Sequence, residues 1–225
     1  MAFLGDSITM GQGAGAATYK FYAAQVTELV GKDVSCWNLG LGYARANDLL
    51  HSRVWLEKAK QNDIVVVCLG TNDVNSGTYL DADRDAQEIY ADIAAICDEL
   101  ESAGCEIILL STPPFGYGSE QKKANCLELG EMLLALAEER EYDFIDTVAL
   151  WGTAGDMATS KYPASSSDYH PNALGCEILA QAFVNQGIIE PVLPEVDSDI
   201  PFVKDEDEDY WDSPIIRPRP GDIIQ

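Results

Sequence analysis

The sequence predicts an α/β fold, a three-layer α/β/α sandwich on a mostly parallel sheet of about five strands. Short apolar runs alternate with segments of helical periodicity along the chain. One run, IVVVCL at 64–69, is continuously apolar and rich in β-branched residues, as in a strand buried on both faces. This order favours parallel strands joined by helices on both faces of the sheet.

In chain order, the apolar runs predict strands at 2–4, 33–37, 64–69, 107–110 and 142–145, and helices at 18–30, 46–60, 83–103, 120–140 and 171–186. The helix at 46–60 would place Leu49, Leu50, Val54 and Leu56 near one side, and the helix at 83–103 an isoleucine-rich stripe. Pro171 suits the first position of the last helix, and Gly187 suits its end.

Composition limits the class of protein. The 225 residues, 47% of them hydrophobic, suffice for one domain with a full core. A net charge of -24 repels nucleic acid and anionic membranes, so we expect neither as a partner. Two histidines and six cysteines without a CxxC motif predict no metal site, and we expect no cofactor.

The chain divides into a predicted catalytic domain at 1–190 and a tail at 191–225. The tail holds six of the ten prolines and the acidic run KDEDEDYWD. Two interpretations stay open: a disordered extension, or an arm that packs on a neighbouring copy and makes a homo-oligomer. The arm would bury Phe202, Trp211, Ile215 and Ile216.

The sequence leaves the location of the protein open. It shows no signal peptide or transmembrane span, so the chain as given is expected in the cytoplasm. Because the first motif begins almost at the first residue, a trimmed N-terminus and secretion remain an alternative. The scattered cysteines favour a reducing compartment or an anaerobic host.

A glycine-rich loop, GQGAGA at 11–16, raises the alternative of a dinucleotide-binding oxidoreductase. Three features oppose it. The loop starts six residues after the first strand, the second strand carries no acid for a ribose hydroxyl, and no basic residue lies in the loop. A flexible turn beside an open site is the simpler interpretation.

Four short blocks carry candidate chemistry: GDS at 5–7, NLGLGYAR at 38–45, GTND at 70–73 and DYHPN at 168–172. The first three follow predicted strands, so they gather at the edge of the sheet where ligands bind in such folds. A serine nucleophile needs a base, oxyanion donors and a group that orients the base. The blocks offer residues for each.

In their order and spacing these blocks resemble those of the SGNH (GDSL-type) hydrolase family. The resemblance spans Gly5 to Asn172 and implies a flavodoxin-like sheet and a serine esterase that works through an acyl-enzyme. It implies Ser7 as the nucleophile and His170 as the general base. Oxyanion donors would be the Ser7 backbone N–H, the Asn72 side chain and the block-two glycine, Gly42.

Two departures from the family pattern leave alternatives open. Block two is one residue short, so Tyr43 or Gly40 could take the place of Gly42. The family acid lies three residues before the histidine, where this chain has Ser167, whereas Asp168 lies two before. Asp168 could still orient His170 from an extended segment, because residues two apart point to the same side. The alternative is a Ser-His dyad, with His170 held by a backbone carbonyl or by Ser167.

The expected substrate is a small-acyl ester of a carbohydrate, acetyl above all. Small residues after Ser7 suggest an open site, and Tyr43, Trp151 and Tyr169 are candidate platforms for a sugar. A lipid esterase of lysophospholipase or thioesterase type is the alternative. A non-catalytic binding protein on the same fold is a third interpretation.

Overall fold

The computed structural model describes residues 1–12, 20–74, 84–113, 119–151 and 170–192. Five strands form one parallel sheet in the order β2-β1-β3-β4-β5. They are β1 (Ala2–Gly5), β2 (Trp37–Gly40), β3 (Ile64–Cys68), β4 (Glu106–Leu110) and β5 (Asp143–Ile145). This is the order of a flavodoxin-like sheet, so the predicted fold class is confirmed.

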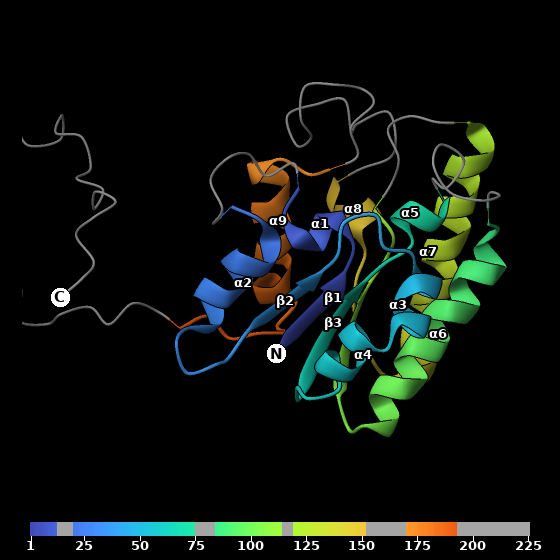
Figure 1. The fold of residues 1–225 in the computed structure, drawn as a ribbon. Coiled ribbons are helices and arrows are strands. Elements are labelled where there is room, and N and C mark those ends of the chain that lie inside the picture. Colours follow the sequence, from blue (N-terminus) through green and yellow to red (C-terminus); the bar gives the residue numbers. More distant parts are fainter. Residues whose placement is uncertain (13–19, 75–83, 114–118, 152–169, 193–225) are drawn as a thin grey trace, which may run out of the picture. The chain divides into compact units, whose positions relative to one another are not determined.

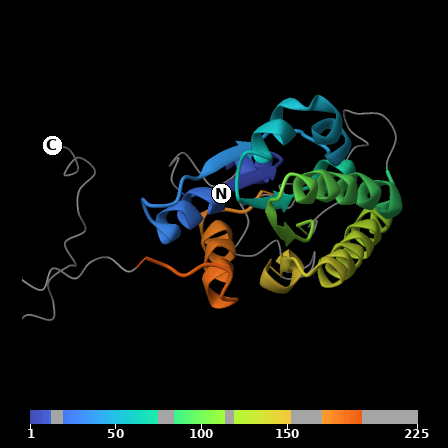
Figure 2. The same cartoon turned by 90° about the horizontal axis from the view of Figure 1, so that it is seen from below.

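Helices cover both faces of the sheet (Figures 1 and 2). Helices α2 (Tyr22–Val30) and α9 (Ala173–Asn185) pack together on one face, and the other face carries α3 (Ala46–Ser52), α4 (Val54–Ala59), α6 (Ala86–Ser102) and α7 (Glu120–Arg140). The short helices are α1 (Ser7–Met10), α5 (Thr71–Val74) and α8 (Thr147–Trp151).

Successive side chains of each strand point to opposite faces of the sheet, which divides the core into two clusters. Leu4, Val67 and Leu109 face α3, α4, α6 and α7, whereas Phe3, Val66 and Ile108 face α2, α8 and α9. Buried β-branched and leucine side chains on both faces are typical of a sheet between two helix layers.

Several predicted elements were wrong in their bounds. The helices expected at 18–30 and 83–103 begin later, at Tyr22 and Ala86. The strand expected at 33–37 lies at Trp37–Gly40, where only Leu39 is fully buried. The helix expected at 46–60 is two helices, because Arg53 has a φ of 57° and interrupts it; Val54 is consequently 60% exposed. The last helix begins after Asn172, whose side chain accepts from the Gly175 N–H, so Pro171 precedes the cap.

Met1–Val192 form one compact unit, and Leu193–Gln225 are separate from it. Apart from Pro191 and Val192, the tail predicted at 191–225 lies outside the described residues, so its two interpretations stay predictions. In the part of the chain that is described, no helix is both long and apolar enough to cross a membrane.

Candidate active site

Ser7 is held at the carboxyl end of the central part of the sheet. Strand β1 ends at Gly5, Asp6 caps the one-turn helix α1, and Ser7 is the first residue of that helix. Asp6 Oδ1 accepts from the Ile8 N–H at 2.8 Å. The first N–H groups of a helix have no partner within it, so the Ser7 N–H can donate to a bound group.

Two neighbouring elements fix α1 in place. The Thr9 hydroxyl lies 2.8 Å from the hydroxyl of Tyr22 on α2, and Asn38 Nδ2 of β2 donates to the Thr9 carbonyl at 2.9 Å. At Gly40 the backbone of β2 approaches α1 so closely that a Cβ would lie 2.2 Å from Met10 N. A helix of one turn has little stability of its own, so these contacts determine where Ser7 lies.

The structure brings together Ser7 and His170, which are 163 residues apart in the sequence. Ser7 Oγ lies 2.9 Å from His170 Nε2, and both side chains are buried. When Nε2 carries no proton, the serine hydroxyl donates to it, which is the arrangement a nucleophile and its general base require. His170 directly precedes Pro171 and Asn172, the cap of α9.

Asn72 is buried within α5, the short helix that follows β3. Its Nδ2 donates to the Ala44 carbonyl in block two at 2.9 Å. An amide nitrogen carries two hydrogens, so one N–H anchors the side chain and the second remains for another acceptor.

Asp73 connects the GTND block to the segment directly after block two. Its carboxylate accepts from the Ala46 N–H at the start of α3 and from Arg84 at 2.7 Å. Burial raises the pKa of Asp73, while these two donors act in the opposite direction. Arg84 also pairs with Asp92 on α6, so one ion-pair network supports the turn that carries Asn72.

Block two turns sharply after β2. Tyr43 has a φ of 63° and is 67% exposed, and Gly42 lies beside the Met10 side chain of α1. Asn38 Oδ1 accepts from the Gly40 N–H at 2.8 Å and thereby shapes the start of the turn. Because the Gly40 N–H is already donated to Asn38, Gly42 and Tyr43 are the candidates left for the block-two donor.

Asp6 is a buried carboxyl directly before the candidate nucleophile. Burial raises its pKa to about 7, against the lowering effect of the Ile8 N–H and the Thr71 hydroxyl. Thr71 lies close enough to act on that pKa, yet neither Asp6 Oδ2 nor Thr71 Oγ1 has a partner in hydrogen-bonding geometry. Asp6 and Thr71 are thus two buried polar side chains near each other, each directly before a candidate catalytic residue in the sequence.

Sequence reasoning gave no role to Asp6, Thr71, Asp73 or Arg84. Three of them stand inside the GDS and GTND blocks, and a carboxylate directly after a buried strand was the available signal. Arg84 carried no such signal, because its partners are 8 and 11 residues away in the sequence.

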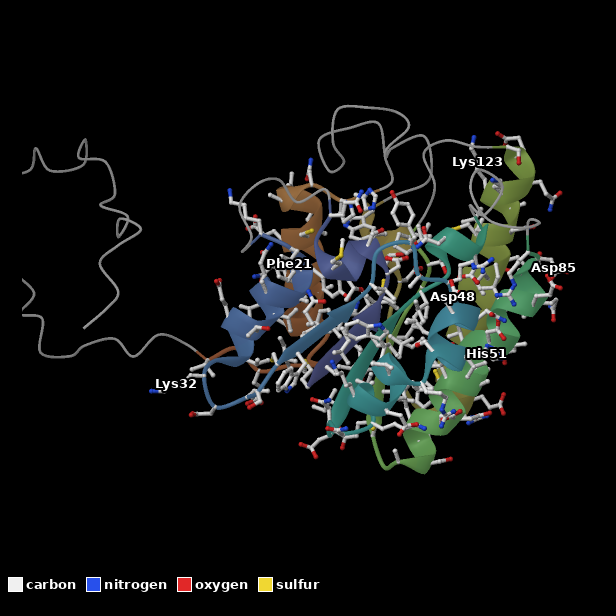
Figure 3. The ribbon with its side chains drawn as sticks, viewed as in Figure 1. Phe21, Lys32, Asp48, His51, Asp85 and Lys123 are labelled. Atoms are coloured by element: carbon white, nitrogen blue, oxygen red, sulfur yellow. The ribbon has the colours of Figure 1, made fainter. Side chains whose placement is uncertain are left out.

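The other residues considered in the sequence analysis are not part of the described site. Asp168, Ser167 and Tyr169 fall outside the described residues. Trp151 is fully buried and donates from Nε1 to the Gly175 carbonyl, so it presents no face to a sugar. His51 is exposed on α3, with Nδ1 2.8 Å from the Asn47 carbonyl (Figure 3), as expected of a surface histidine.

Among the residues with a described position, no group of three or more His, Cys, Asp or Glu side chains could hold a metal ion. The six cysteines, all of them within the described part, are free thiols, and five are buried.

Solved structures with the same fold include several esterases. A lipolytic protein of the G-D-S-L family from Veillonella parvula is 19% identical, with a TM-score of 0.68 over 83% of this chain and 97% of that one. An acetyl-xylooligosaccharide esterase from Geobacillus stearothermophilus is 26% identical, with a TM-score of 0.65 over 86% and 95%. An aryl esterase from M. smegmatis is 17% identical, with a TM-score of 0.63 over 82% and 96%.

No curated protein matches the chain in sequence. The model of the GDSL-like lipase/acylhydrolase family matches residues 3–178, which include β2 to β5, all of β1 except Ala2, and both Ser7 and His170. This chain therefore belongs to the GDSL-like lipase/acylhydrolase family.

Proposed function

We propose that this protein is a serine carboxylester hydrolase that removes small acyl groups, acetyl above all, from carbohydrates. One observation carries the hydrolytic part of the proposal: the 2.9 Å contact between Ser7 Oγ and His170 Nε2 at the ligand-binding edge of the sheet. The likeness to an acetyl-xylooligosaccharide esterase supports the substrate class.

In the proposed reaction, His170 Nε2 takes the Ser7 hydroxyl proton as Oγ attacks the ester carbonyl carbon. The tetrahedral oxyanion accepts hydrogen bonds from the Ser7 N–H, the second Asn72 N–H and the Gly42 N–H. The intermediate collapses, and the alcohol leaves with the proton from His170. Water, activated by His170, then releases the acid and restores Ser7.

Hydrolysis of p-nitrophenyl acetate, butyrate and octanoate by wild type and Ser7→Ala tests this proposal. We expect the rate to fall steeply with chain length and to vanish in the variant, because the nucleophile is lost. A rate that rises with chain length would favour a lipid esterase. Equal rates in both proteins, or a folded wild type without activity, would contradict the mechanism and favour a binding protein.

Asp168→Asn in the same assay separates triad from dyad. We propose Asp168 as the residue that orients His170. Its loss should lower kcat by orders of magnitude, up to about 10⁴-fold by analogy with a buried triad acid. A loss below about tenfold would instead favour the dyad.

A further inference from the structure

A cavity of about 480 Å³ lies between the edge strand β2 and helix α4. None of Ser7, Asn72 and His170 lines it. Trp37, on its wall, pairs with Ala2, three residues before the end of β1. Leu39 also lines the cavity and pairs with Leu4, so the cavity runs along β2 towards the end of the sheet that carries Ser7. Its lining distinguishes it from the candidate active site, because that lining includes none of the side chains assigned to catalysis.

Two tryptophans from different elements form its apolar wall. Trp37 of β2 is 60% exposed, whereas Trp55 of α4 packs partly against the core. Lys58 extends over the Trp55 ring, with Nζ 5.0 Å from the ring centroid. A large indole surface exposed on an edge strand is costly in water and typical of a surface that meets a ligand or partner.

Two carboxamides at the end of α4 supply fixed polar groups. Gln61 Nε2 donates to the Glu57 carbonyl at 3.1 Å, and Asn62 Nδ2 donates to the Lys58 carbonyl at 3.0 Å. These bonds use the amide nitrogens to cap the helix end. The amide oxygens therefore have a defined orientation and keep their capacity to accept hydrogen bonds.

Charge narrows the class of ligand. The chain carries a net charge of -24, yet none of the described residues that line this cavity is a carboxylate, and the one charged side chain among them is Lys58. A cationic ligand would find no counter-charge here. A neutral or weakly acidic polyol would find hydrogen-bond acceptors, a cationic donor and two aromatic surfaces.

We propose that this cavity binds a pyranose ring of an oligosaccharide. The C–H face of a pyranose is apolar and packs on an indole, while its hydroxyl rim can reach the amide oxygens and Lys58. This proposal is separate from the hydrolytic one, because no reacting group lines the cavity.

Isothermal titration of the full-length Ser7→Ala variant with xylohexaose and cellohexaose tests the proposal. We expect saturable binding of at least one oligosaccharide. Adding Trp37→Ala should raise the dissociation constant at least about tenfold, because a central aromatic contact is lost. Gln61→Ala should raise it less. Val54→Ala is the matched control, because Val54 is also 60% exposed on α4 but does not line the cavity.

Trp37→Ala in the Ser7-containing protein should hydrolyse p-nitrophenyl acetate at the wild-type rate, which separates this site from the catalytic one. Absence of binding to both sugars, or equal binding by the Trp37→Ala variant, would overturn the proposal even if hydrolysis is intact. A dimer in sedimentation that Trp37→Ala converts to monomer would also overturn it, because the surface would then join two copies of the chain.

Discussion

The carboxyl of Asp6 links the stability of the candidate site to pH. Its pKa is raised to about 7 by burial, whereas an aspartate in an unfolded chain titrates near about 4. The folded state therefore holds this proton more tightly. The contribution of Asp6 to the free energy of unfolding is greatest below about pH 4 and is lost as pH rises through about 7.

Asp6→Asn removes this titration but keeps a cap, since asparagine is an equally good N-cap and its amide can donate to Thr71 Oγ1. We expect the variant to be more stable than wild type at pH 7.5, by at most about 4 kcal/mol at 1.36 kcal/mol per pKa unit. The advantage should shrink at pH 4.5. Urea unfolding at both pH values measures it.

Asp85→Asn is the control, because the Asp85 side chain also caps a helix, accepting from the Glu88 N–H of α6, but Asp85 is exposed. If both variants change the free energy of unfolding equally at the two pH values, the effect comes from capping. The explanation by a proton held on buried Asp6 is then rejected.

The sequence predicted Ser7, His170 and Asn72 only because four blocks appear together. Nothing local to Ser7 shows that His170 lies 2.9 Å away, since that contact depends on the packing of α9 and α2 against the sheet. The raised pKa of Asp6 and the Asn72–Ala44 hydrogen bond likewise arise from burial and from neighbouring loops, which no pattern of residue types records.

At the scale of elements, the contact between β2 and α1 decides where the nucleophile stands. A Cβ at Gly40 would meet backbone atoms of α1, Met10 Cα at 2.6 Å among them, whereas a Cβ at Gly42 would meet only the flexible Met10 side chain at 3.5 Å. Backbone cannot yield without moving α1. We therefore expect Gly40→Ala to shift the helix that carries Ser7.

Gly40→Ala should lower the free energy of unfolding by about 1–3 kcal/mol and reduce kcat on p-nitrophenyl acetate. Gly42→Ala is the matched comparison and should leave stability nearly unchanged, because 3.5 Å is an ordinary contact. Chemical denaturation and the esterase assay on both proteins measure this. Equal stability of the two variants would show that α1 tolerates displacement.

The bounds of strands with strong apolar runs, such as β3 and β4, were predicted to within one residue. The edge strand β2 was displaced because an edge is half exposed and carries a weaker pattern. The break at Arg53 lacks a glycine or proline signal, and α1 and α5 are too short to show periodicity. Tertiary contacts determine all of these features.

At the scale of the whole molecule, all five strands and both core clusters lie within Met1–Val192. The last residue of this unit is hydrogen-bonded to α2, since the Val192 N–H donates to the Leu29 carbonyl at 2.8 Å. The tail beyond it carries ten acidic against three basic residues. Such a segment has too little apolar content for its length to form a core.

Removing Leu193–Gln225 should therefore leave the melting temperature within about 2 °C of the full chain, since a loss of 1 kcal/mol would shift it by about 2–4 °C. Calorimetry measures this, and sedimentation of both proteins reports the oligomeric state. An unchanged state and unchanged hydrolysis of p-nitrophenyl acetate would identify the tail as an extension. A full-length oligomer that becomes monomeric on truncation would identify it as the arm between copies, because four large apolar side chains would then lose the surface that covers them.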